Sequence, residues 1–160
     1  MKKFFFSLFL LLITLAIQST IANYLLVGDI QINLILLIVI STSLVFGEFF
    51  GIIFGFIAGI LGDFLFGHIL GLFAFVNMSC AFISLKIRRF FTKKHYIIPS
   101  IVTIIITEIW IFLTYTISFS LGKKVITDNL INNIIYQPLI NGLAILIIHP
   151  LIKKIASLLK

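Results

Sequence analysis

The chain has 160 residues, of which 61% are hydrophobic and only 11% are charged, and its formal net charge is +7. A mean hydropathy of +1.27 excludes a soluble globular domain, because such domains are far less apolar. Apolar runs long enough to cross about 30 Å of hydrocarbon recur along the whole chain. Only short loops separate them, which excludes a soluble catalytic domain. The composition therefore predicts an all-α integral membrane protein with one polytopic domain over residues 1–160.

Six apolar runs along the chain predict six transmembrane helices. They cover residues 4–22, 30–46, 49–66, 69–85, 97–121 and 130–152. The first run follows Lys2 and Lys3, and its alternative is a secretory signal peptide with Thr20-Ile21-Ala22 as the cleavage site. We favour a retained span, because the apolar part continues past the usual signal length and five further runs follow.

Very short connections predict which spans are neighbours. Gly47-Glu48 alone separates the second span from the third, and Gly67-His68 alone separates the third from the fourth. Spans two, three and four are therefore expected to pack as antiparallel neighbours. The longer connections, residues 86–96 and 122–129, leave spans five and six free to choose their contacts.

The distribution of basic residues predicts the orientation. With six spans and an internal N-terminus, only Lys123 and Lys124 lie on the outer side. The inner side receives Lys2, Lys3, Lys86, Arg88, Arg89, Lys93, Lys94, Lys153, Lys154 and Lys160. This asymmetry obeys the positive-inside rule, whereas five spans with the first one retained would place the 86–94 cluster and the 153–160 tail on opposite sides. Both termini are therefore predicted to be cytoplasmic.

A repeat of small residues marks the third span. Every fourth position is small or special, at Gly47, Gly51, Gly55, Gly59, Asp63, Gly67 and Gly71. Four residues turn a helix by about 400°, so each step drifts by about 40° and the whole series cannot form one face. We expect the helix to end near Asp63. The first four glycines then form a groove in which another helix backbone, of this chain or of another protein, can approach closely.

Asp63 is expected about one turn from the outer end of the third span. A carboxylate there is unfavourable with the dipole of its own helix, so it needs a partner. The candidates are His68, a backbone N–H of the Gly67–Gly71 turn, or the start of the fourth span. We favour a structural role for Asp63, Gly67, His68 and Gly71 in an outer turn, because one histidine with one aspartate is weak support for a metal site.

Glu108 lies near the middle of the fifth span, where an ionisable residue is costly and needs a reason. A polar strip is expected to run beside it on one face of the helix, formed by Thr103, Thr107, Thr114 and Ser118. The alternatives are a helix–helix interface and a proton or substrate site. We favour the interface, because no basic residue lies at matching depth in another span.

Two asparagines lie within other spans. Asn77 shares one side of the fourth span with Cys80 and Ser84, and Asn141 follows Pro138 in the sixth. Pro138 is expected to kink or break that helix. The chain has no phosphate-binding loop, nucleophile elbow, zinc-protease motif or paired cysteine motif. We therefore expect no enzymatic activity, no cofactor, no metal and no nucleic-acid partner.

Residues 47–71, GEFFGIIFGFIAGILGDFLFGHILG, followed by LFAFVNMSCAFISLKIRRF, resemble the rod-shape-determining protein MreD family. That family is similar in having the helix pattern G-x-x-x-G-F-x-x-G-x-x-x-D, a short G-x-x-x-G turn and a span that ends in basic residues. The matching positions are Gly51, Gly55, Phe56, Gly59, Asp63, Gly67, Gly71, Lys86, Arg88 and Arg89. The segment Tyr136–Ile155 also resembles the final span of the family, with Pro138 and Asn141 in the expected places.

The resemblance implies a non-enzymatic, multi-pass scaffold in the bacterial cytoplasmic (inner) membrane that supports cell shape and peptidoglycan synthesis. The implied partners are an MreC-like protein and, through it, MreB, RodA and the transpeptidase partner of RodA. Anionic lipids are expected at the inner basic clusters, and self-association stays open.

The family's fold is similar to the six-helix substrate-binding subunits of energy-coupling-factor vitamin transporters, which supplies the alternative function. Such a subunit needs polar residues gathered near its outer mouth. The outer candidates form no specific constellation; they are Asp29, Gln31, Asp63, His68, Lys123, Lys124, Asp128 and Asn129.

Overall fold

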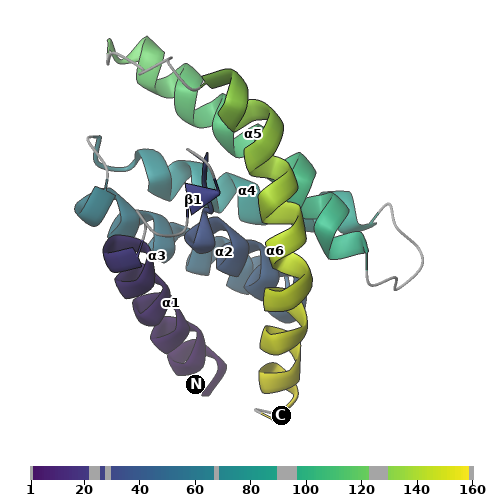
Figure 1. Cartoon of the computed structure of the whole chain (residues 1–160). Coiled ribbons are helices and arrows are strands. Elements are labelled where there is room, and N and C mark those ends of the chain that lie inside the picture. The colour runs from purple at the N-terminus through teal and green to yellow at the C-terminus, as the bar shows by residue number, and fades with distance from the viewer. Residues whose placement is uncertain are drawn as a thin grey trace.

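The protein is seen in a computed structural model that describes residues 2–21, 26–27, 30–66, 69–89, 97–122 and 130–158. The described part contains six helices and two short strands (Figure 1). In chain order they are α1 (Lys2–Ile21), β1 (Leu26–Val27), β2 (Ile30–Gln31), α2 (Leu34–Phe46), α3 (Glu48–Phe66), α4 (Leu72–Arg89), α5 (Ile98–Ser120) and α6 (Leu130–Leu158). The predicted helical fold with six helices is confirmed.

Three of the helices are long and apolar enough to cross a membrane. These segments are Glu48–Phe66, Ile98–Ser120 and Asn133–Leu158, while Phe5–Thr20 and Leu34–Phe46 are shorter apolar helices. Helix α4 carries three basic residues in its last turn. Length and composition therefore support membrane crossing most directly for α3, α5 and α6.

Helix α2 is the centre of the bundle. It contacts each of the other five helices, and every residue from Ile35 to Leu44 is buried. One side of α2, with Ile38 and Val39, packs in a core with α1 and α3. The opposite side, with Leu36 and Ile40, packs in a second core with α4 and α5. A helix that is apolar all round is typically buried in this way.

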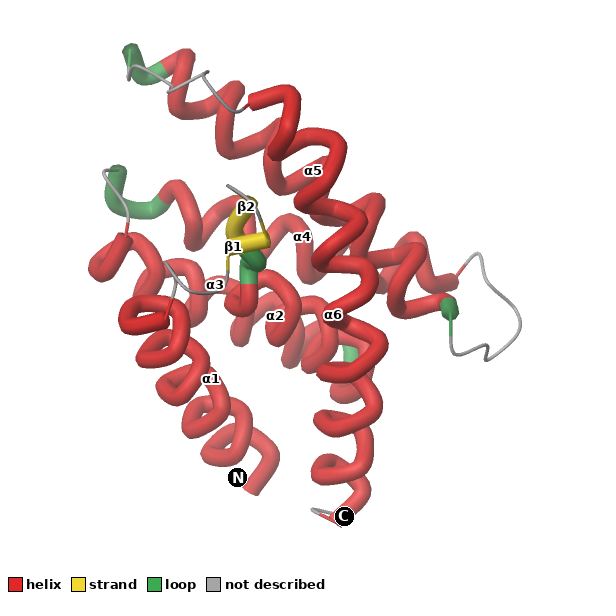
Figure 2. The backbone as a smooth tube through the Cα atoms, in the orientation of Figure 1, coloured by secondary structure: helices red, strands yellow, loops and turns green. Residues whose placement is uncertain are grey.

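The second predicted span begins differently from the prediction. Ile30–Gln31 forms β2, which pairs antiparallel with β1 beside the start of α2 (Figure 2). Helix α2 begins only at Leu34, because the side chain of Asn33 accepts a hydrogen bond from the Leu36 N–H at 3.0 Å and caps the helix. The strand pair was not predicted.

The boundaries of two other helices also differ from the prediction. Helix α4 starts at Leu72, after Gly71 with φ +91°, and continues through the basic residues to Arg89. Helix α6 runs to Leu158 and includes both Pro138 and Pro150. Of the two expectations for Pro138, a kink or a break, the break does not occur because the helix is continuous there; the helix curves along its length in Figure 1. Such prolines are tolerated where neighbouring groups and local adjustments accommodate the freed backbone.

Three glycines of α3 allow close contacts with other helices of this chain. A Cβ at Gly51 would lie 2.7 Å from Cβ of Ser43 on α2. At Gly55 it would lie 2.8 Å from the Asn77 carbonyl oxygen on α4, and at Gly59 it would overlap the backbone of Ala74. The groove is thus filled by α2 and α4. The expected contacts among spans two, three and four are confirmed.

Gly47 was predicted to belong to the same groove, and this is wrong. It lies between α2 and α3 with φ +102°, and an added Cβ would meet nothing within 4 Å. Its role is conformational, because L residues rarely adopt such a backbone angle. The helix also continues three residues past Asp63 to Phe66 before the turn.

Gly59→Ala is expected to lower the free energy of unfolding by about 2 kcal/mol, because the new methyl group must push the α4 backbone away. Gly62→Ala is the matched control on the same helix, since its Cβ would meet Phe73 at an ordinary 3.5 Å. The thermal midpoint of the detergent-solubilised protein measures both changes. Equal midpoints for the two variants would contradict the close approach at Gly59.

Candidate functional site

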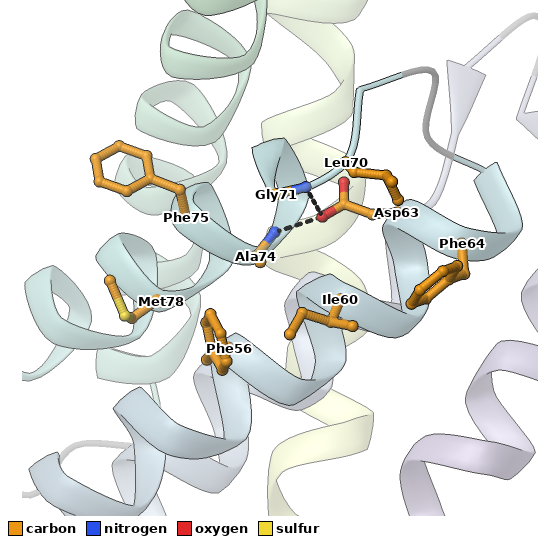
Figure 3. A pocket seen from close by; sticks show the side chains of 9 residues that line it. All are labelled: Phe56, Ile60, Asp63, Phe64, Leu70, Gly71, Ala74, Phe75 and Met78. Atoms are coloured by element: carbon orange, nitrogen blue, oxygen red, sulfur yellow. Dashed lines mark hydrogen bonds between the residues drawn. The ribbon is translucent and has the colours of Figure 1, made fainter.

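Asp63 joins α3 to the start of α4. Its side chain is 2% exposed. One carboxylate oxygen, Oδ2, accepts hydrogen bonds from the backbone N–H groups of Gly71 at 2.9 Å and Ala74 at 3.2 Å, as Figure 3 shows. The other, Oδ1, accepts from Phe73 N–H at 2.9 Å. These donors lie at the beginning of α4, where a helix cannot satisfy its own N–H groups.

The electrostatics of this arrangement explain why a carboxylate is stable at Asp63. It lies in the last turn of α3, where the dipole of its own helix disfavours negative charge. The beginning of α4 carries the opposite partial charge, and three N–H groups compensate for the loss of water. Of the partners considered from the sequence, the carboxylate takes the turn residue Gly71 and the start of α4. Gly67 and His68 lie outside the described residues.

An apolar groove of about 430 Å³ lies beside this hydrogen-bonded turn. It is lined by Phe56, Ile60, Asp63, Phe64, Leu70, Gly71, Ala74, Phe75 and Met78, all drawn in Figure 3. Both oxygens of Asp63 are occupied by backbone N–H groups. The groove therefore presents mainly hydrocarbon, and no group of three metal-ligating side chains occurs among the described residues.

A second polar cluster holds the start of α2. Gln18 of α1 donates from Nε2 to the Ile32 carbonyl at 3.1 Å and accepts at Oε1 from the Leu34 N–H at 2.9 Å. Asn141 of α6 accepts at Oδ1 from the Asn33 N–H at 3.2 Å. Side-chain amides from two distant helices therefore satisfy the backbone where the chain enters α2.

Asn141 also connects this cluster to α5. Its Nδ2 donates to Oγ1 of Thr107 at 3.3 Å, and its side chain is 0% exposed. The sequence indicated Asn141 as an intramembrane polar residue but did not indicate Gln18 or Asn33. Gln18 could have been found as an amide inside an apolar run. Asn33 could have been found as a helix-capping residue type directly before an apolar run.

Asn77 links α4 to α5. Its Oδ1 accepts a hydrogen bond from Trp110 Nε1 at 3.2 Å, and the Trp110 ring stacks on Phe73 with centroids 5.9 Å apart. The Asn77 side chain is buried. Its polar atoms are therefore used in helix packing.

Glu108 does not share a face with the buried threonines of α5. Thr103 and Thr107 are fully buried, whereas Glu108 is exposed. The strip begins on the inner face of α5 with Thr103 and Thr107, and Glu108 lies outside it, because consecutive residues of a helix point about 100° apart. Glu108 therefore points away from Asn141 and its partner Thr107.

The basic end of α4 is tied to the connection between α2 and α3. Arg89 forms an ion pair with Glu48 at 2.6 Å, and Lys86 Nζ lies 4.0 Å from the same carboxylate. Arg88 donates to the Leu44 carbonyl at 2.6 Å, near the end of α2. Cations at the C-terminal end of a helix are favourable there. These contacts fix the end of the bundle opposite the Asp63 turn.

Asp63→Asn is expected to destabilise the protein by about 1–3 kcal/mol, because an amide nitrogen cannot accept from the backbone N–H groups and leaves at least one unpaired. Glu48→Gln is the control, since the half-exposed ion pair of Glu48 contributes at most about 1 kcal/mol. Hydrogen exchange at Phe73 and Ala74 should accelerate in Asp63→Asn alone. Unchanged exchange at these amides would refute the capping role.

Comparison with known proteins identifies the family. No curated protein and no solved structure matches the chain. The family model of the rod shape-determining protein MreD matches residues 1–159, which is almost the entire sequence. The matched region includes the Asp63 turn, the glycines of α3 and the polar cluster at the start of α2. The resemblance seen in the sequence is thereby confirmed, and the chain belongs to the MreD family of rod shape-determining proteins.

Proposed function

We propose that this protein is a non-enzymatic membrane scaffold of the bacterial cell-elongation complex. The observation that carries the proposal is the family match over residues 1–159, because the MreD family functions in rod shape determination. The family is associated with the MreC and MreB shape complex in general. The proposed direct partner is an MreC-like protein, which connects the chain to MreB, RodA and the transpeptidase partner of RodA.

The use of the polar side chains supports a scaffold. Asp63, Gln18 and Asn141 hydrogen-bond to backbone groups, and Asn77 hydrogen-bonds to Trp110. These groups stabilise helix packing. Asp63 also lines the apolar groove, but its carboxylate oxygens accept hydrogen bonds from the backbone at the start of α4. A scaffold would need a well-packed bundle, and the burial of α2 among the five other helices supports this proposal.

The alternative, a substrate-binding subunit of an energy-coupling-factor transporter, has no observation in its favour. The groove beside Asp63 is lined by apolar side chains, and its carboxylate is used by the α4 backbone. The likeness of the fold to those subunits stays a prediction.

The proposed topology has six spans in the cytoplasmic membrane with both termini inside the cell. The basic-residue distribution supports it, and both labelled termini lie at the lower end of the molecule in Figure 1. Lys153 and Lys154 are exposed near the C-terminus. Together with Lys86 they are the proposed contacts for anionic lipid head groups.

Loss of the protein is expected to convert a rod-shaped host bacterium into round cells, because wall synthesis would no longer be oriented along the cell. Microscopy after depletion checks this result, and re-expression of the chain is the control.

The tagged chain should also capture the MreC-like protein from membranes solubilised in mild detergent. Rods that persist after complete depletion, or tagged chain purified without that partner, would refute the scaffold.

The topology is tested with paired reporter fusions. A fluorescent or phosphatase reporter placed after Lys94 should report a cytoplasmic position, and the same reporter after Gly122 should report an external one, because α5 lies between them. An external signal after Lys94 would contradict the six-span arrangement.

A further inference from the structure

Helix α5 presents an exposed stripe that contains a carboxyl group. The exposed residues recur every three or four positions, as expected for one face of a helix. We call this face the Glu108 stripe; it consists of Ile101, Ile105, Glu108, Phe112, Thr116 and Phe119. All its other members are hydrophobic or neutral, so Glu108 is the single charged group of the stripe.

Glu108 lies close to the middle of a helix that is long and apolar enough to cross a membrane. It lies ten positions after Ile98 and twelve before Ser120, which corresponds to about 15 Å and 18 Å of helix rise. These distances place its carboxyl group far from both ends of the helix. Within the hydrocarbon, such a group is costly unless it is paired or faces a polar environment.

No hydrogen bond or ion pair of Glu108 occurs within the described part of the chain. The described cations of α4 lie at its C-terminal end, where Arg89 pairs with Glu48 and Arg88 binds the Leu44 carbonyl. Lys153 and Lys154 lie near the end of α6. The fold therefore satisfies Asp63 with three backbone donors but leaves Glu108 outward-facing.

We propose that the Glu108 stripe binds a transmembrane helix of another protein, and that a lysine or arginine side chain at mid-bilayer depth on this helix pairs with Glu108. Charge complementarity selects this partner, because a cation offsets the cost of the carboxylate in hydrocarbon. A second copy of this chain fits less well. Its own stripe would bring a second carboxylate, and the described part offers no cation in the middle of an exposed helix face. The inference rests on the proposed scaffold function.

Site-directed photocrosslinking in living cells tests the proposal. A photoreactive amino acid replaces Ile105 or Phe112, which flank Glu108 on the stripe, and replaces Ile53 of α3 as the matched control on another exposed face. We expect adducts at Ile105 and Phe112 but not at Ile53. The crosslinked peptide should lie in a membrane helix that carries a lysine or arginine at mid-depth.

Substitutions of Glu108 then test the charge pair. Adduct yield should fall at least about tenfold in both Glu108→Leu and Glu108→Gln, as expected when a desolvated charge pair loses one member. Glu108→Asp should retain the adduct. Glu108→Lys should lose it and regain it when the partner's cation is replaced by glutamate. Because Glu108 faces outward, the thermal midpoints of these variants should equal that of the wild type.

Several results would overturn the proposal. These are adducts with lipid alone, adducts with a second copy of this chain, a partner helix without a cation, or full adduct yield in Glu108→Gln. If the chain with native Glu108 captures the MreC-like protein but gives no adduct from position 105 or 112, the charge pair is refuted and the scaffold function is left intact. Persisting rods after depletion of the whole chain would instead refute the scaffold function.

Discussion

The structure depends on satisfying backbone polar groups where helices begin inside an apolar bundle. Water is scarce there, and each unpaired N–H or C=O costs several kcal/mol. In two irregular segments of the chain, side chains from other helices form hydrogen bonds with these backbone groups. Asp63 of α3 accepts from the first N–H groups of α4. Gln18 of α1 and Asn141 of α6 pair with the backbone that precedes α2. The same hydrogen bonds therefore cap helices and fix which helices are neighbours.

The central position of α2 makes these caps necessary. With 13 residues it is about 20 Å long, shorter than a hydrocarbon layer of about 30 Å. In the proposed six-span topology, the backbone before Leu34 would lie at membrane depth without being helical, and such backbone is tolerated only when it is buried in protein. The surrounding helices provide that environment. Gly51 of α3 contributes by allowing α3 to approach α2 at Ser43.

Local patterns in the sequence were sufficient for the helices and for the close contacts of α3. Hydropathy located the six helices, and the four-residue glycine spacing identified Gly51, Gly55 and Gly59, although it wrongly included Gly47. The dipole argument showed that Asp63 needed a partner and included the correct one among its candidates. What local patterns could not supply was pairing between distant segments. Asn33 and Asn141 are 108 positions apart, and the partner of Gln18 is a short stretch of backbone that was expected to be helical. Whether Glu108 faces the bundle or the outside depends on which face of α5 packs against α6, and the sequence does not specify that face.

The carboxylates of Asp63 and Glu108 differ in whether their partners lie within the chain. Asp63 is buried and fully hydrogen-bonded, so its chemistry is used within the chain. Glu108 is exposed, and no described residue pairs with it. A scaffold in a membrane cannot use hydrophobicity to select its partner, because lipid is equally apolar. Selection must come from close packing and from polar groups. In this chain the glycine packing surface of α3 is already occupied by α2 and α4. The outward carboxyl group of α5 is therefore the feature by which the proposed partner helix would be distinguished from lipid.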